Sequence, residues 1–263
     1  MFDSARWESF AFRDDDIIIS TPPKSGTTWT QMLCALLIFD TWDLPEPLAR
    51  LSPWLDMQTR PLASVTADLD AQTHRRFIKT HTPLDGLPTD PRVTYLCVGR
   101  DPRDVSVSWS NHWSNMDLDA MSALRAEAVG LDDLAEIGPP PPEPSADPVE
   151  RFRNWVDAPA GQDNTLERTL RHLQTFWDRR EEPNVALFHY SDLSADLPRT
   201  YSLQCAPTCV GGPLSLGRGT GHDDAHHGWG PVIGDLGVGA GGSCPPQPHP
   251  PNPKTHPHPT HPP

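Results

Sequence analysis

The chain has 263 residues and a formal net charge of −14. This length suits one α/β domain with a full hydrophobic core, and the acidic balance argues against binding to nucleic acid or to an anionic membrane surface. No apolar run is long enough to span a membrane, and the charged segment 1–16 lacks the apolar core of a signal peptide, so we expect a cytoplasmic protein.

Short apolar runs alternate with helical patterns as far as residue 197. The predicted strands are Asp16–Ser20, Arg76–Lys79, Val93–Val98 and Asn184–His189. The predicted helices are Thr27–Phe39, Pro102–His112, Leu118–Val129, Pro148–Asp157 and Asn164–Arg180. Asn164, with Glu167 three residues later, is the predicted N-cap of the last helix. The alternation predicts an α/β domain over residues 1–197, a P-loop-like three-layer fold whose central, mostly parallel sheet is flanked by helices.

The composition changes near Pro198. Residues 198–263 hold 12 of the 18 glycines, 14 of the 32 prolines and seven of the 12 histidines. Such a segment has little apolar surface to bury, so we expect a disordered tail and a domain truncated at its C-terminus. Cys205, Cys209 and nearby histidines lack the usual spacing of zinc sites, and we expect no metal.

The stretch after the first predicted strand carries the clearest functional signal. Three isoleucines, 17–19, lead into a small turn that holds Lys24 and Gly26, and a helical pattern follows at once. A strand, a turn and a helix N-terminus in this order bind phosphate groups on backbone N–H donors. Lys24 adds a positive charge, Gly26 lets the backbone approach an anion, and Thr27 and Thr28 add hydroxyls. Because the lysine precedes the glycine, this is not the Walker A order.

Two further loops follow the second and third predicted strands. Lys79 and His81 follow the second strand, and Arg100 lies eight residues before Ser108 after the third. In an open parallel sheet, ligands bind beyond the carboxyl ends of the strands, so the three loops are expected to open onto one crevice. The side chains expected around a polyanionic ligand there are Lys24, Lys79, His81, Arg100 and Ser108.

Together these segments resemble the PAPS-dependent sulfotransferases of the cytosolic type. Thr-Pro-Pro-Lys-Ser-Gly-Thr-Thr-Trp at residues 21–29 is similar to that family's 5′-phosphosulfate loop, and Lys-Thr-His at residues 79–81 is similar to its catalytic segment. Arg100 and Ser108 match its 3′-phosphate segment, and residues 189–193 are similar to a later segment whose tyrosine contacts adenine. The resemblance covers about three quarters of the chain.

The resemblance implies transfer of a sulfuryl group from 3′-phosphoadenosine-5′-phosphosulfate (PAPS) to a hydroxyl or amine of a small acceptor, without a metal. It implies His81 as general base, Lys24 at the leaving oxygen and Lys79 at the sulfuryl oxygens. The residues that it implies for binding the nucleotide are Lys24, Ser25, Gly26, Thr27, Thr28, Trp29, Arg100, Ser108 and Tyr190. Ordinary packing is the alternative role for Trp29 and Tyr190.

The acceptor and the oligomeric state are not readable from the sequence. The residues expected to form the acceptor wall are mostly aromatic, which suggests an apolar or aromatic alcohol, and core packing is an equal alternative role for them. They are Trp7, Trp42, Trp54, Met57 and the Trp109–Trp113 region. The histidines expected at the surface or in the core, and not as ligands, are His74, His112 and His172.

Nothing after Pro198 resembles the late Arg-Lys-Gly loop with which family members close over the nucleotide. We hypothesise that the reading frame shifts near Leu197. The alternative function is a catalytically weak or inactive remnant that still binds PAPS or its product, adenosine 3′,5′-bisphosphate (PAP). A small-molecule kinase of the P-loop class is disfavoured, because both the Walker A order and a Walker-B-like strand are missing.

Overall fold

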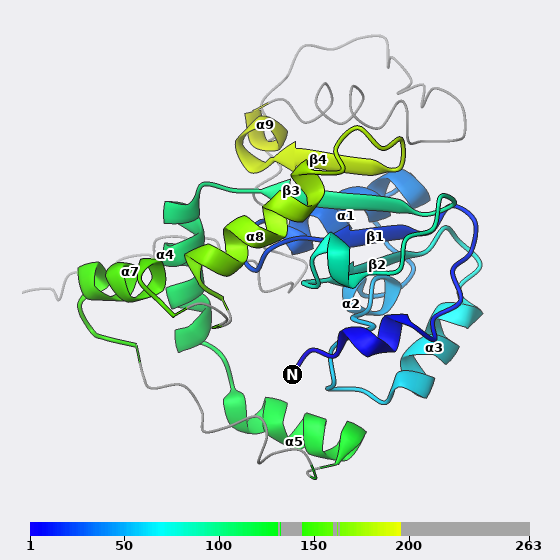
Figure 1. The fold of residues 1–263 in the computed structure, drawn as a ribbon. Helices are drawn as coiled ribbons and strands as arrows, with labels where there is room; N and C mark the ends of the chain where they lie inside the picture. Colours follow the sequence, from blue (N-terminus) through cyan, green and yellow to red (C-terminus); the bar gives the residue numbers. More distant parts are fainter. Residues whose placement is uncertain (131, 133–143, 160–161, 163, 196–263) are drawn as a thin grey trace, which may run out of the picture.

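Four parallel strands form the centre of the protein, here described from a computed structural model (Figure 1). The structure describes residues 1–130, 132, 144–159, 162 and 164–195, so the expected tail at 198–263 lies outside the described residues. The strands, in the spatial order β2-β1-β3-β4, are β1 (Ile17–Ser20), β2 (Phe77–Thr80), β3 (Thr94–Gly99) and β4 (Val185–His189). The predicted parallel sheet is confirmed, and each strand begins one residue later than predicted.

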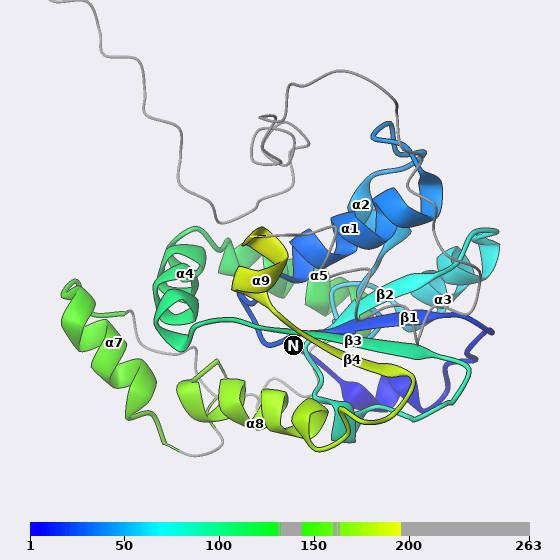
Figure 2. The same ribbon diagram turned by 90° about the horizontal axis from the view of Figure 1, so that it is seen from above.

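Helices cover both faces of this sheet (Figure 2). They are α1 (Thr27–Phe39), α2 (Leu48–Leu51), α3 (Leu62–Ala71), α8 (Leu166–Trp177) and α9 (Tyr190–Ala195). Successive side chains of a strand point to opposite faces. Ile17 and Ile19 therefore pack into one core with residues of α1, α2 and α9, whereas Ile18 packs into the other core with residues of α3 and α8. The expected three-layer α/β fold is confirmed.

The remaining elements lie around this centre. They are the short turns η1 (Ser4–Trp7) and η2 (Leu84–Gly86) and the helices α4 (Pro102–Ser114), α5 (Leu118–Val129) and α7 (Pro148–Val156). Figure 1 shows α4 and α7 beyond the carboxyl ends of the strands. Within the described ranges, no helix has the length and apolar character needed to cross a membrane.

Two details of the helices differ from the sequence prediction. Thr165, and not Asn164, is the N-cap of α8: its hydroxyl accepts the N–H of Arg168 at 3.3 Å, while Asn164 has a φ of 57° and lies outside the helix. The short helices α2, α3 and α9 were not predicted. In α3 only Val65 and Leu69 are buried, which is too few apolar positions for a clear helical period.

A buried ion pair joins the beginnings of β1 and β2. Arg76 donates through Nε to Asp16 Oδ1 at 2.8 Å and through Nη2 to Oδ2 at 2.5 Å, and each side chain is 1% exposed. The backbone N–H of Arg13 donates to the same carboxylate at 2.8 Å. Removing one member of such a pair leaves the other charge out of water without a full partner.

We therefore expect Asp16→Asn to lower the free energy of unfolding by about 3–5 kcal/mol, because the Arg76 guanidinium loses its buried counter-charge. Asp14→Asn is the matched control. Asp14 pairs with Arg92 at 3.0 Å, but both side chains are exposed, so a loss below about 1 kcal/mol is expected. Urea denaturation of the two variants measures the difference, and equal losses would contradict it.

His172 lies in the core between α8 and the sheet and is 3% exposed, as expected of a core histidine. Its Nε2 is 3.0 Å from the hydroxyl oxygen of Ser20, which gives its own proton to the Thr82 carbonyl at 2.6 Å. Nε2 is therefore the donor of this contact. Burial, followed by the nearby His81, lowers the pKa of His172 to about 3.

This low pKa predicts acid sensitivity. The unfolded chain protonates His172 near pH 6.5 but the folded protein does so only near pH 3, so the free energy of unfolding falls as the pH falls below about 6.5. His172→Gln keeps a donor toward Ser20 and does not titrate. Between about pH 7 and about pH 4.5, the free energy of unfolding of this variant is expected to fall by about 2–3 kcal/mol less than that of the unaltered protein. Urea denaturation at both pH values is the test; an undiminished acid loss in the variant would refute it.

Candidate active site

The loop after β1 is curled by two residues with positive φ. Lys24 has a φ of 64°, and Gly26, the N-cap of α1, has a φ of 106°. No side chain caps α1, so the N–H groups of its first turn, which have no acceptor within the helix, are available to an anion. The hydroxyls of Thr21 and Thr27 lie 2.5 Å apart and close the loop. The predicted anion-binding loop thus has the expected local shape.

Tyr190 lies directly over this loop. The positive φ favours glycine at position 26, and a Cβ there would also come within 3.1 Å of Tyr190 Cδ2, which is closer than an ordinary contact. The Tyr190 ring also lies 5.3 Å from the ring of Trp29, in the first turn of α1, and 4.7 Å from the Arg100 guanidinium. Four residues expected at the nucleotide site therefore form one cluster.

Two hydrogen bonds join the three loops at the carboxyl edge of the sheet. Arg100, which follows β3, donates to the carbonyl of Lys24 at 3.1 Å. His81, which follows β2, lies 2.7 Å through Nδ1 from the carbonyl of Thr21. The three loops therefore meet in one place, as the sequence predicts.

In the described residues, three of the six buried side-chain atoms that lack a hydrogen bond belong to residues expected at the nucleotide site. Within the described part of the chain, Ser25 Oγ, Arg100 Nε and Ser108 Oγ are buried and make no hydrogen bond. Arg100 also has a looser ion pair with Asp104, at 3.8 Å. Buried polar groups in proteins are nearly always satisfied, so three exceptions on the expected nucleotide-binding residues favour a polar ligand here. A phosphate or sulfate group has the acceptors that the Arg100 and serine donors need.

The hydrogen bond to Thr21 defines the state of His81. A carbonyl only accepts, so Nδ1 carries the proton and Nε2 of the neutral ring keeps its lone pair. The ring also packs against Trp54, with 4.7 Å between centroids, and against Phe2, at 5.8 Å. Burial lowers the pKa of His81 to about 4, and the charges of Lys79 and Lys24 add to this, against the opposing effect of the Thr21 bond. The imidazole of His81 is thus neutral at pH 7.

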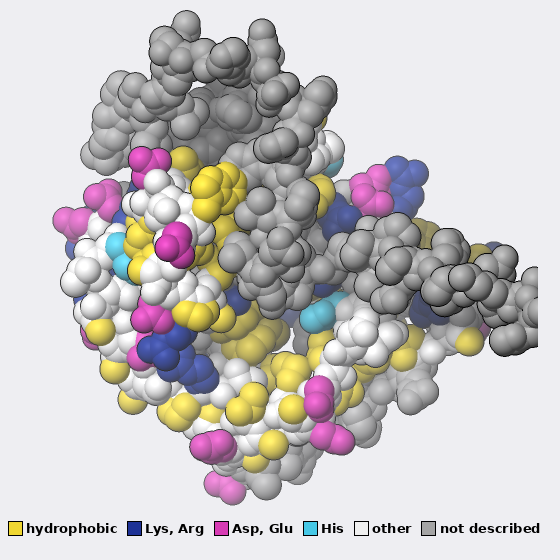
Figure 3. All heavy atoms as spheres, turned by 180° about the vertical axis from the view of Figure 1, so that it is seen from behind, with side chains coloured by type: hydrophobic (Ala, Val, Ile, Leu, Met, Phe, Trp, Pro, Cys, Tyr) yellow, Lys and Arg dark blue, Asp and Glu magenta, His cyan; other side chains and the backbone are white. Residues whose placement is uncertain are grey.

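Both lysines of the site are half-buried cations. Lys79 Nζ lies 4.9 Å from the centre of the Trp54 ring, and burial lowers the pKa of Lys79 to about 8. Burial, and then the charge of Arg100, lowers the pKa of Lys24. In contrast, the face shown in Figure 3 carries acidic and basic side chains in small scattered groups. The junction of the three loops is therefore a local concentration of positive charge on an acidic chain.

The aromatic residues expected near an acceptor divide into two groups. Trp54 borders His81, whereas Trp7 is 1% exposed in the core and Trp42 is 52% exposed.

Two residues near His81 were missed from the sequence. Phe2 packs on both Trp54 and His81, and Asp56 is fully buried beneath the loop after β2. The aromatic character of Phe2 was a usable signal, but the burial of Asp56 was not visible in the local pattern.

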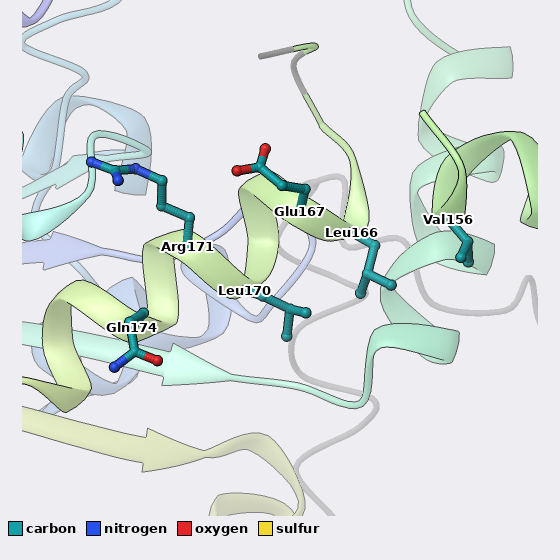
Figure 4. A pocket seen from close by; sticks show the side chains of 6 residues that line it. All are labelled: Val156, Leu166, Glu167, Leu170, Arg171 and Gln174. Carbon is teal, nitrogen blue, oxygen red and sulfur yellow. The ribbon is translucent and has the colours of Figure 1, made fainter. Parts of the chain in front are cut away.

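A separate hollow of about 470 Å³ lies beside α7 and α8 (Figure 4). Its lining residues are Val156, Leu166, Glu167, Leu170, Arg171 and Gln174. None of them belongs to the three loops, and they offer little chemistry beyond one ion pair of Arg171 with Asp85 at 2.5 Å. The junction of the three loops at the strand ends is the stronger candidate.

Curated proteins of similar sequence are sulfotransferases. The chain is 50% identical over 210 residues to the glycolipid sulfotransferase of Mycobacterium tuberculosis (strain H37Rv), a match that covers 75% of this chain and 64% of the relative. It is 27% identical over 199 residues to human sulfotransferase 1E1, over 72% of this chain and 58% of the relative. The chain thus spans less than two thirds of the length of these curated relatives.

Solved structures share the fold at low sequence identity. Retinol dehydratase in complex with retinol and PAP has a TM-score of 0.52 and 21% identity, over 78% of this chain and 63% of that one. Mouse sulfotransferase SULT7A1 complexed with PAP has a TM-score of 0.51 and 17% identity, over 80% and 64%. The sulfotransferase domain matches residues 14–202. Because the sulfotransferase domain matches more than half of the chain and half of the 210 aligned residues are identical to those of a curated sulfotransferase, the chain belongs to the sulfotransferase domain family.

Proposed function

We propose that the protein transfers a sulfuryl group from PAPS to a hydroxyl or amine of a small acceptor, in the cytoplasm and without a metal. The observation that carries this proposal is the junction of three loops by the His81–Thr21 and Arg100–Lys24 hydrogen bonds. The three loops, with the start of α4, carry a neutral imidazole, two lysines and three buried polar atoms that make no hydrogen bond. These are the groups that sulfuryl transfer between two oxygen atoms needs.

In the proposed reaction His81 Nε2 takes the proton of the acceptor hydroxyl as its oxygen attacks sulfur. The bond between sulfur and the bridging oxygen breaks, and the leaving phosphate keeps the electron pair. Lys24 and the N–H groups at the start of α1 stabilise the charge on that oxygen, and Lys79 stabilises the sulfuryl oxygens. The products are a sulfate ester, or a sulfamate from an amine, and PAP.

The proposed nucleotide contacts divide between the ends of PAPS. Residues Ser25, Gly26, Thr27 and Thr28 hold the 5′-phosphate, and Arg100 Nε and Ser108 Oγ, which make no hydrogen bond in the described residues, take the 3′-phosphate. Trp29 and Tyr190, whose rings already contact each other, border the adenine. The PAP bound by retinol dehydratase and by mouse SULT7A1 supports a bisphosphate nucleotide as the ligand.

We propose an acceptor with an apolar body. Trp54 and Phe2 present aromatic surface beside His81, and aromatic walls favour apolar or aromatic ligands. A glycolipid sulfotransferase among the relatives, and retinol and androsterone in the structures of retinol dehydratase, agree with an apolar alcohol. Sulfate-transfer assays with a panel of phenols, alcohols and amines identify which acceptor the protein uses.

The first test removes the proposed base. His81→Ala is expected to lower sulfate transfer from labelled PAPS by a factor of about 10² to 10⁴, while the affinity for PAP changes less than about twofold. His74→Ala is the control: His74 is also a half-buried histidine, with a contact to the Arg75 carbonyl at 2.9 Å, but it precedes β2. Transfer that is unchanged in His81→Ala would exclude His81 as the base. PAP binding by the unaltered protein without transfer to any acceptor would instead support the inactive remnant.

The second test addresses the 3′-phosphate. Ser108→Ala is expected to weaken PAP binding by about 10-fold or more, because one hydrogen bond to a charged phosphate is lost. Adenosine 5′-monophosphate, which lacks the 3′-phosphate, is expected to bind equally to the variant and the unaltered protein. Ser110→Ala, on the same helix but bonded to the Ser106 carbonyl at 3.1 Å, is the control. Calorimetric titration measures all three, and an equal loss with both nucleotides would place Ser108 away from the 3′-phosphate.

A further inference from the structure

A short segment before α3 runs beside the end of β2, which leads into the loop that holds His81. Trp54 forms a parallel bridge with Lys79 of β2, and the N–H of Lys79 donates to the Pro53 carbonyl at 3.3 Å. Two residues after Trp54, the side chain of Asp56 is fully buried under the end of β2. A carboxylate in that position is costly unless it is well hydrogen-bonded.

One oxygen of Asp56 collects three donors. Oδ2 accepts from the hydroxyl of Thr80, from the hydroxyl of Thr82 at 2.8 Å and from Nε1 of Trp7 at 3.1 Å. The Thr80 oxygen in turn accepts the backbone N–H of Thr82 at 2.8 Å. Both residues that flank His81 are therefore tied to the same buried carboxylate.

The other side of the loop is also held. The Thr82 carbonyl accepts the hydroxyl proton of Ser20 at 2.6 Å, and Ser20 accepts from His172. With Asp56 on one side and Ser20 on the other, the backbone on either side of His81 has little freedom to move. A fixed backbone keeps Nδ1 of His81 at 2.7 Å from the Thr21 carbonyl and so maintains the tautomer with a free Nε2.

We propose that Asp56 is a positioning residue for His81: it anchors Thr80 and Thr82 so that the imidazole keeps its hydrogen bond to Thr21. The proposal rests on the proposed function for its effect on catalysis, but not for its effect on the ring of His81. Oδ1 of Asp56 has no partner in the described residues, and burial raises the pKa of this carboxyl. A group kept at such a cost, with its bonds directed at both neighbours of His81, has more than a packing role.

Thr82→Val tests this with the least disturbance, because it keeps the shape of the side chain and removes one donor to Asp56. We expect kcat for transfer to fall about tenfold, with KM for PAPS and the affinity for PAP changed less than about twofold. Asp56→Ala is expected to lower kcat about 10²-fold. Asp56→Asn, which keeps an acceptor oxygen in place, is expected to restore part of that loss.

The state of the ring is read independently by NMR titration of the histidine side chains, with the His81 signal identified by its loss in His81→Gln. In Thr82→Val the pKa of His81 is expected to rise from about 4 toward the ordinary value of about 6.5, as the ring leaves its buried position. The titratable groups facing His81 are Lys79 on β2, Lys24 on the first loop, His112 on α4 and His172 on α8. None of them is altered by this substitution.

Thr169→Val is the matched control. Thr169 is also buried, and its hydroxyl donates one hydrogen bond, to the Thr165 carbonyl at 2.9 Å within α8. Its replacement is therefore expected to lower the free energy of unfolding about as much as Thr82→Val does, without altering the His81 loop. An unchanged kcat and His81 pKa in Thr82→Val, or equal changes in Thr169→Val, would overturn the positioning role. A shifted His81 pKa together with unaffected transfer in His81→Ala would retain the positioning role and reject the base.

Discussion

The parallel pairing of β1 with both of its neighbours is the constraint on which the site depends. Ser20 lies opposite Thr80 of β2, and Ile19 lies opposite Leu96 of β3, so the three strands end at the same edge of the sheet. Because of this register, the loop after β1 is able to bond to both neighbouring loops. The buried Asp16–Arg76 pair fixes the opposite ends of β1 and β2. A shift of one residue in either pairing would turn the core residues of β1 to the wrong faces and separate the loops.

Much of this arrangement was predictable because it is encoded locally. The three isoleucines of β1 and the lysine and glycine that follow describe a strand, a turn and a helix start within one short stretch. The resemblance of this stretch and three later segments to one family indicated the site. Asp56 was not predictable. Its three partners lie 24, 26 and 49 residues away in the sequence, so no local period reveals that this acid is buried. Similarly, the cap of α8 depended on the backbone angle of Asn164, which a capping pattern does not specify.

The site combines positive charge with aromatic surface. Lys79 lies over Trp54, Arg100 lies over Tyr190, and both cations are partly shielded from water. Shielding strengthens each interaction with an anion, because less solvent competes for it. It also disfavours the charged state of the lysines and of His81, which lowers their pKa values. An anionic ligand offsets this cost. Burial therefore disfavours the charged form of these side chains in the free protein, but it strengthens their attraction to an anion in a complex.

The shielding of Lys79 by Trp54 has a chemical consequence. The lysines of the chain are Lys24, Lys79 and Lys254, so both lysines of the described part lie in the site. With a pKa of about 8, the amine of Lys79 is unprotonated at neutral pH to an extent roughly two orders of magnitude greater than an ordinary lysine. The free amine, and not the ammonium ion, reacts with acylating and aldehyde reagents. Lys79 is therefore expected to react with these reagents faster than an ordinary lysine does, and a nucleotide bound at the junction of the three loops is expected to protect it.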